Sequence, residues 1–175
     1  MAEKGKHERF KGMVAQRAVT VGRPREELYR YWRDFRNLTF MEHLEAVAVR
    51  DDGTSHWVAK GPAGARLEWD AAITRENENE RLDWEAIKGS GMVGGGSVLF
   101  KDAPGGRGTE LKVLLFYDPP GGNLGSAFAK LFGGDPSQMI REDLRRFKQL
   151  METGEIATIE GQPTGRAAQP QEGRP

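Results

Sequence analysis

Few residues of this 175-residue chain have the type and spacing that catalysis or metal binding requires. The chain contains no cysteine, which excludes disulfides, thiolate catalysis and cysteine-based metal sites. Its three histidines, His7, His43 and His56, have no metal-ligand spacing, so we expect no metal site and no cofactor. No Gly-x-Ser-x-Gly or other nucleophile signature occurs. The remaining candidates for proton transfer are His43 and Tyr117.

Two pairs of carboxylates flank tryptophans in segments that alternate apolar and polar residues. Successive residues of a strand point to opposite faces, so the carboxylates face solvent if Trp69 and Trp84 face the interior. This pattern favours a solvated outer face over a set of general acids. The four carboxylates are Glu68, Asp70, Asp83 and Glu85.

The segment "GSGMVG" (89–94) matches the glycine pattern of dinucleotide-binding loops. Such a loop must lead into a helix whose N-terminus faces the pyrophosphate. Here the strand-like segment "GGSVLF" follows instead. The sequence therefore predicts a hairpin loop and no nucleotide site.

Charge and hydropathy exclude two further classes of partner. The formal net charge is zero, so no overall field attracts nucleic acid. No run of 18 apolar residues and no signal peptide occurs, and we expect a soluble cytoplasmic protein. The basic segments "KGKHERFK" (4–11) and "RRFK" (145–148) predict at most weak contact with an anionic membrane. Since Glu142 and Asp143 precede "RRFK", a solvated helix face is the simpler interpretation.

The residues considered so far must be positioned by a sheet and a long C-terminal helix. Asp135 at the N-cap, Pro136 at the first position and Gln138 at the third form a capping-box arrangement. Gly154 occupies the position of a left-handed C-terminal cap. Between them one narrow apolar stripe runs along the helix, formed by Ile140, Leu144, Phe147 and Met151.

Further elements follow from periodicity and turn signals. Pro24 begins a helix whose predicted buried stripe is Leu28, Tyr31, Trp32 and Phe35. Asn37 caps a second short helix, and another is predicted over 123–133. We expect strands over 14–21, 44–51, 55–60, 65–74, 81–87, 97–102 and 109–118.

The predicted order is one strand, two short helices, six antiparallel strands and a C-terminal helical region. We expect one α+β domain over 13–156, with a flexible tail over 1–12 and a disordered tail over 157–175. Each strand has one polar face, so the helices must cover the other face.

Four stretches carry a resemblance to a known family: "PREELYRYWRDFRNLTFMEHLEAV", "SHWVAKGPAGARLEWDAAI", "GRGTELKV" and "YDPPGGNLGSAFAKLFGGDPSQMIREDLRRFKQLMETGE". The chain resembles the START-like SRPBCC superfamily, and within it the bacterial polyketide cyclase/dehydrase and coenzyme-Q-binding START group. The resemblance implies a helix-grip fold, in which a strongly curved sheet of about seven strands wraps around the long C-terminal helix. It also implies a cavity between sheet and helix for an apolar ligand.

The narrow stripe of the last helix cannot fill a deep concave sheet alone, so aromatic side chains must contribute volume or leave a space. The alternative for each of these side chains is ordinary core packing. We expect the cavity to be lined by Phe40, Met41, Trp69, Trp84, Phe100, Leu115, Tyr117, Leu144, Phe147 and Met151.

Three functions remain open at this point. We favour a binding or carrier module that holds a hydrophobic small molecule such as a quinone, a lipid or a polyketide-like compound. The first alternative is a polyketide aromatase/cyclase or dehydratase in which Tyr117 or His43 moves a proton. The second is a protein-interaction domain without a ligand. The sequence leaves open whether the protein is a monomer or a homodimer.

Overall fold

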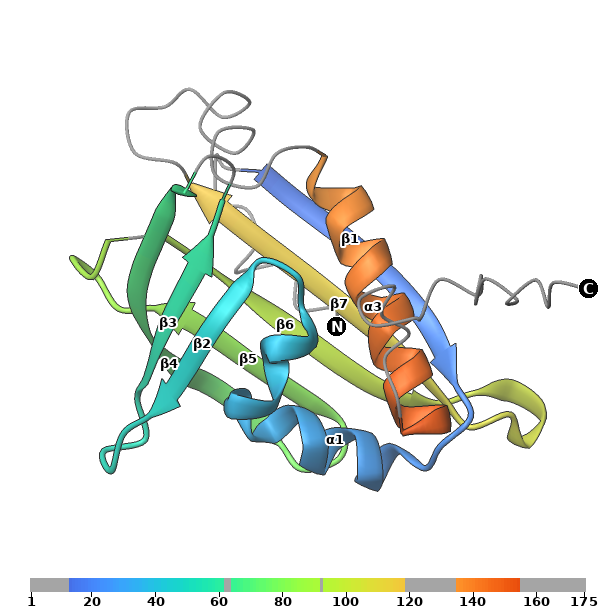
Figure 1. Cartoon of the computed structure of the whole chain (residues 1–175). Helices are drawn as coiled ribbons and strands as arrows, with labels where there is room; N and C mark the ends of the chain where they lie inside the picture. Colours follow the sequence, from blue (N-terminus) through green and yellow to red (C-terminus); the bar gives the residue numbers. More distant parts are fainter. Residues whose placement is uncertain (1–12, 62–63, 92, 119–134, 155–175) are drawn as a thin grey trace, which may run out of the picture.

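The computed structural model describes residues 13–61, 64–91, 93–118 and 135–154. Within these ranges the chain forms a seven-stranded sheet, two α-helices and two short 3₁₀ helices (Figure 1). The helix predicted over 123–133 lies outside the described residues. In chain order the elements are β1 (Met13–Val21), α1 (Arg25–Arg33), η2 (Phe35–Phe40), β2 (Leu44–Val49), β3 (Ser55–Lys60), β4 (Arg66–Asn77), β5 (Arg81–Ala86), β6 (Val93–Asp102), η4 (Pro104–Gly106), β7 (Thr109–Asp118) and α3 (Pro136–Thr153).

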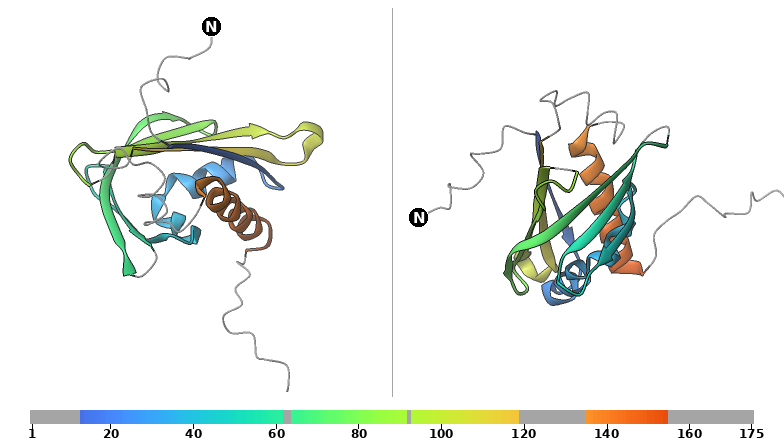
Figure 2. Two further views of the ribbon diagram at one scale, coloured as in Figure 1. Left: turned by 90° about the horizontal axis from the view of Figure 1, so that it is seen from above. Right: turned by 90° about the vertical axis from the view of Figure 1, so that its left-hand side faces the viewer.

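All neighbouring strands of the sheet are antiparallel, in the order β1-β7-β6-β5-β4-β3-β2. Register shifts between Leu44 and Ala46 in β2, and between Ile73 and Arg75 in β4, bend the strands locally. The sheet curves strongly, and α1 and α3 lie on its concave side (Figure 2). The predicted α+β helix-grip fold is confirmed.

Both ends of α3 are defined by the residues that the sequence indicates. The side chain of Asp135 accepts a hydrogen bond from the backbone N–H of Ser137 at 2.9 Å. Gly154 has φ = 77°, and its N–H donates to the carbonyl of Leu150 at 2.8 Å. The other half of the predicted capping box, in which the Gln138 side chain accepts the N–H of Asp135, does not form, and Gln138 Nε2 instead donates to Glu142 Oε1 at 2.9 Å.

The C-terminal turn of α3 is tied to the chain where β1 ends and α1 begins. Lys148 Nζ donates to the carbonyl of Thr20 and to Glu152 Oε1, both at 2.7 Å. The same Glu152 oxygen accepts the backbone N–H of Gly22 at 2.8 Å. Arg23 Nε donates to the carbonyl of Met151 at 3.0 Å. These bonds hold the helix in one axial position across β1.

An aromatic cluster beneath α3 forms part of the core. Phe147 is completely buried, with its ring centroid 5.2 Å from that of Trp32 and 5.3 Å from that of Phe40. Leu144 is also buried in this core. The apolar stripe of α3 therefore contacts other core side chains, and it joins the helix to η2 and α1.

The two N-terminal helical segments differ from the prediction in their register. Tyr29, rather than Tyr31, is buried in α1, and its hydroxyl donates to Glu76, which also accepts from Arg33 Nε at 2.6 Å. Burial and the bond to Glu76 raise the pKa of Tyr29 to about 12. Strand β4 extends to Asn77, beyond its predicted end, and this places Glu76 within reach of α1.

The second short helix begins earlier than predicted. It starts at Phe35, and the N-cap is Asp34, whose side chain accepts the N–H of Arg36 at 3.2 Å. Asn37 therefore lies inside the helix instead of capping it.

The glycine-rich segment is part of the sheet. The predicted loop over 89–94 was partly wrong, because β6 begins at Val93 and includes Gly94, Gly95 and Gly96. Gly96 pairs with Trp84 on β5 and with Leu115 on β7. A Cβ atom at Gly96 would lie 2.8 Å from Leu115 Cδ2 and closer still to the indole of Trp84. A strand and not a helix follows these glycines, which agrees with the absence of a dinucleotide loop.

We expect Gly96→Ala to lower the free energy of unfolding by about 1–3 kcal/mol, because the added methyl group overpacks Trp84 and Leu115. Urea denaturation measures the change, and near-ultraviolet circular dichroism reports the displaced indole. Gly22→Ala is the control. Its Cβ would meet only the flexible carboxylate of Glu152, at 3.3 Å, so we expect a change within about 0.5 kcal/mol. Equal stability of the two variants would contradict the prediction.

Candidate functional site: an apolar cavity between the sheet and α3

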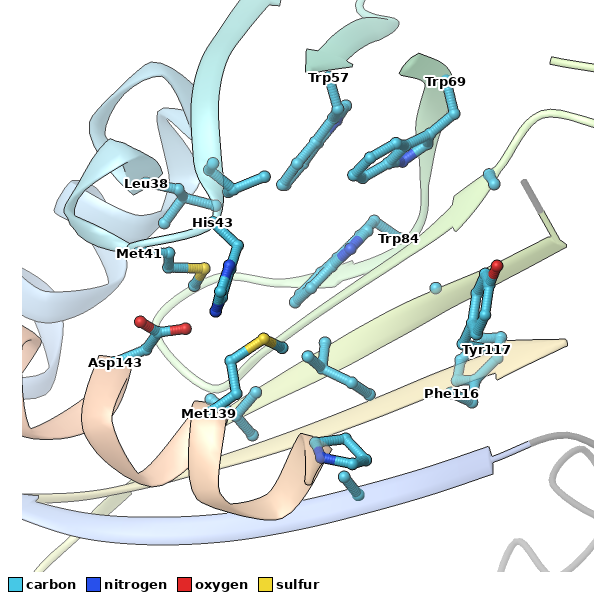
Figure 3. Close-up of a pocket in the computed structure, with 17 residues that line it drawn as sticks. Leu38, Met41, His43, Trp57, Trp69, Trp84, Phe116, Tyr117, Met139 and Asp143 are labelled. Atoms are coloured by element: carbon cyan, nitrogen blue, oxygen red, sulfur yellow. The ribbon is translucent and has the colours of Figure 1, made fainter. Parts of the chain in front are cut away.

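A cavity of about 130 Å³ lies between the concave face of the sheet and α3 (Figure 3). Its lining combines residues from all seven strands, from η2 and the turn after it, and from the N-terminal half of α3. The lining residues are Ala15, Leu38, Met41, His43, Leu44, Trp57, Trp69, Trp84, Ala86, Gly95, Val113, Leu115, Phe116, Tyr117, Pro136, Met139 and Asp143. Nearly all of these groups are apolar, so water gains few hydrogen bonds inside.

Three tryptophans from consecutive strands form one wall of the cavity. Trp57 on β3 and Trp69 on β4 are cross-strand partners, with ring centroids 5.8 Å apart and planes 20° apart. Trp84 on β5 lies 6.5 Å from Trp57 at an interplanar angle of 10°. The indole N–H of Trp57 donates to Ser55 Oγ at 2.7 Å, which fixes this ring. The wall is therefore apolar and built from nearly parallel rings.

The tryptophan wall depends on the absence of a side chain at Gly96. Because Gly96 has no side chain, the indole of Trp84 lies directly over the backbone of β6. The neighbouring Gly95 lines the cavity itself. A Cβ atom at Gly95 would overlap the backbone of Trp84 and the ring of Phe116, and one at Gly96 would overlap the indole of Trp84.

One carboxylate, Asp143 of α3, faces the otherwise apolar cavity. The residue is only 6% exposed. Its Oδ1 accepts the backbone N–H of Glu42 at 3.2 Å and Arg146 Nη1 at 3.0 Å. Arg146 Nη2 also donates to Glu42 Oε2 at 2.9 Å. Figure 3 shows the carboxylate beside the imidazole of His43, between Met41 and Met139.

Burial raises the pKa of Asp143 to about 6, since an ionised carboxylate loses hydration in the interior. The N–H of Glu42 and the charges of Arg146 and His43 oppose this rise. Asp143 is therefore a titratable group close to neutral pH inside a ligand-sized space. Perturbed carboxylates of this kind are typical of functional sites.

The residues expected in the lining divide into two groups. Met41, Trp69, Trp84, Leu115 and Tyr117 border the cavity, and so does the proton-transfer candidate His43. The other five do not: the structure places Phe40, Phe100, Leu144, Phe147 and Met151 in the core or packed against it. On α3, the stripe formed by Leu144, Phe147 and Met151 faces the core. The same orientation of the helix turns Met139 and Asp143 toward the cavity.

The sequence interpretation missed several lining residues, above all Trp57 and Asp143. Trp57 lies in a short segment with weak alternation, and only its pairing with Trp69 shows that it faces inward. The expectation of a solvated helix face at Asp143 is wrong, because the residue is buried. Pro136, Met139 and Asp143 have i, i+3, i+7 spacing, which was the available signal for a second helical face.

The two candidates for proton transfer lie at opposite ends of the cavity. His43 is beside Asp143, whereas Tyr117 and Phe116 are at the far end (Figure 3). The two side chains therefore do not form one acid–base pair.

The four carboxylates expected on the outer face are absent from the cavity lining. Asp70 accepts from Arg50 Nη2 at 2.8 Å and lies 2.8 Å from His56 Nδ1. Both bonds lower the pKa of Asp70. His56 is thus engaged on the convex side of the sheet, away from the cavity.

Two kinds of feature are absent from the described residues. Within the described ranges, no group of three or more His, Asp or Glu side chains could hold a metal ion. Of the helices in that part of the chain, none combines the length and apolar character needed to cross a membrane.

The raised pKa of Asp143 predicts a specific dependence of stability on pH. Between about pH 4 and 6 the folded state retains a proton that the unfolded chain has released, so raising the pH lowers the free energy of unfolding. A pKa of about 6 in place of 3.8 corresponds to a total loss of about 3 kcal/mol, of which about 2 kcal/mol falls between pH 4 and 6. Asp143→Asn removes the titrating group, so the stability of the wild-type protein relative to this variant should fall by about this amount. Urea denaturation from pH 4 to 7.5 measures it, and parallel curves would contradict the assignment.

Comparison with known proteins identifies relatives of the chain. Residues 21–145 match the family described as "Polyketide cyclase / dehydrase and lipid transport". An uncharacterised 17.2 kDa protein of Streptomyces lincolnensis, from the melC2-rnhH intergenic region, is 30% identical over 152 residues, 86% of this chain and 93% of the relative.

Solved structures share the fold. The crystal structure of DR_A0006 from Deinococcus radiodurans is similar with a TM-score of 0.67 and 39% identity, covering 82% of this chain and 99% of that one. The crystal structure of TTHA0849 from Thermus thermophilus has a TM-score of 0.57 at 22% identity, covering 80% of this chain and 93% of that one, and this likeness shows the fold alone.

Proposed function

Because the chain belongs to the polyketide cyclase/dehydrase and lipid transport family, we propose that it binds and carries a hydrophobic small molecule between the sheet and α3. The observation that carries this proposal is the apolar cavity bordered by Trp57, Trp69 and Trp84. A preformed apolar space with few polar groups is the usual form of a small-molecule site.

The size of the cavity limits the part of the ligand that it encloses. An engineered apolar cavity of about 150 Å³ in another protein binds benzene. A cavity of about 130 Å³ therefore suits one ring or a short chain, such as a quinone ring or the end of a lipid or polyketide. The aromatic lining favours a ring, because aromatic groups gain by packing against one another.

Burial of apolar surface provides most of the binding free energy. A ring that buries roughly 200 Å² gains about 5 kcal/mol at 25 cal/mol per Å². This corresponds to a dissociation constant on the order of 0.2 mM for a single-ring probe. Longer natural ligands bind more tightly if they contact further apolar surface.

The proposal predicts that filling the cavity abolishes binding. Ala86→Leu places a larger side chain in the lining, and we expect it to weaken the binding of propylbenzene and 1-octanol by at least about tenfold. The matched control is Ala48→Leu, at an exposed position of β2. Isothermal titration calorimetry measures both variants. If the wild-type protein binds neither probe, or if the two variants bind alike, the cavity is not the binding site.

A second candidate function is catalysis of polyketide cyclisation or dehydration in the same cavity. The observation that favours it is the position of His43, whose imidazole lies in the cavity beside the buried carboxylate of Asp143. In this role His43 takes a proton from a carbon next to a carbonyl group in the part of the chain that the cavity encloses.

The catalytic candidate predicts that His43→Ala lowers turnover of a tetraketide thioester at least about 100-fold, with the dissociation constant changed by less than about threefold. Tyr117→Phe tests the other end of the cavity in the same assay. Product formation is followed by liquid chromatography and mass spectrometry. Absence of turnover by the wild-type protein, together with tight binding, would leave the carrier function alone.

A further inference from the structure

The polar end of the cavity has a feature that an apolar carrier does not require. Both hydrogen bonds accepted by Asp143 end on Oδ1, from Glu42 N–H and from Arg146. In the part of the chain that the structure describes, Oδ2 accepts no hydrogen bond. Asp143 nevertheless borders the cavity, so an acceptor oxygen is presented where a ligand lies.

Placing this carboxylate here is costly, because burial disfavours its ionised form. A hydrophobic residue at position 143 would extend the apolar surface of Met41 and Met139 without that cost. A group that donates a hydrogen bond to Oδ2 compensates part of it. The position thus favours a ligand with its own donor.

The charges around Asp143 restrict the kind of donor. Glu42 and Asp143 are negative, Arg146 is positive and contacts both carboxylates, and His43 lies beside the site. Arg146 is already shared between two carboxylates, so among the described residues an anionic head group finds no free guanidinium at this end. A cationic head group would carry a further charge into the apolar cavity, and a neutral donor avoids this desolvation cost.

We propose that the ligand of this cavity is a neutral amphipathic molecule whose hydroxyl or phenol group donates a hydrogen bond to Oδ2 of Asp143, while its apolar body lies along the tryptophan wall. This inference rests on the proposed binding function and names the class of ligand. It separates hydroxylated rings and alcohols from fatty acids, phospholipids and molecules that carry acceptors alone.

Three probes of similar shape test the inference: 4-propylphenol, 4-propylanisole and sodium 4-propylbenzoate. The phenol donates a hydrogen bond, the ether only accepts, and the benzoate is an anion. Isothermal titration calorimetry with the full chain at pH 7.5 should show the phenol binding at least about tenfold more tightly than the ether, the gain typical of a hydrogen bond to a charged group. The benzoate should bind most weakly.

Variants assign the preference to one residue. Asp143→Asn keeps an acceptor for Glu42 N–H and Arg146 but removes the charged acceptor, and it should reduce the preference for the phenol to about threefold or less. The control is Glu142→Gln, the same chemical change on the adjacent residue of α3, which lies outside the lining and should keep the full preference. Carbon-13 methyl signals of Met41 and Met139 should shift when the phenol binds.

Each outcome is decisive. Equal affinity of the wild-type protein for the phenol and the ether overturns the inference, and this test requires no variant. The proposed carrier function is unaffected by that result. A preference that survives in Asp143→Asn also overturns it, because the donor then binds elsewhere. If none of the three probes binds, and propylbenzene does not bind either, the proposed function falls together with the inference.

Discussion

A single amphipathic helix laid across a strongly curved sheet cannot fill the space that the sheet encloses. In this protein α3 contacts β1, η2 and α1 through one edge, and the bonds of Lys148 and Glu152 hold it at that position. The edge that carries Phe147 completes the core. The adjacent edge, with Met139 and Asp143, faces an unfilled volume. The cavity is thus a consequence of helix placement and sheet curvature together.

The wall opposite the helix is built from residues that act in pairs across strands. Trp84 occupies its position because Gly96 leaves the space beside it empty, and Trp57 is aligned with Trp69 by strand register. Large rings that stack with each other resist collapse into the cavity, because each ring is already in contact on its face or edge. The stacked tryptophans and the glycine beside Trp84 therefore both help to keep the cavity open.

The buried carboxylate of Asp143 makes one end of this apolar cavity polar. Asp143 is fixed by Glu42 and Arg146, so it does not collapse onto another partner. His43 and Asp143 lie at one end of the cavity, and the tryptophans border the rest of it (Figure 3). The same geometry suits a carrier that protects its ligand and an enzyme that orients a reactive chain.

Local patterns in the sequence were sufficient to predict the order of the helices and strands. The caps Asp135 and Gly154, the strand alternation around Trp69 and Trp84, and the order of strands and helices were predictable because each depends on neighbours in the chain. The resemblance to the START-like superfamily then indicated the helix-grip fold and a cavity. Of the expected lining, the structure brings Met41, Trp69, Trp84, Leu115 and Tyr117 to the cavity.

Only the tertiary structure decided which buried face borders a space and which borders other side chains. Phe147 and Asp143 are four residues apart, yet the first is core and the second faces the cavity. The difference is set by the rotation of α3 about its axis, which depends on contacts with Thr20 and Gly22 more than 100 residues earlier. A helical stripe specifies that a face is buried, but what it is buried against is a property of distant residues. For this reason the sequence determined the scaffold, and packing determined the site.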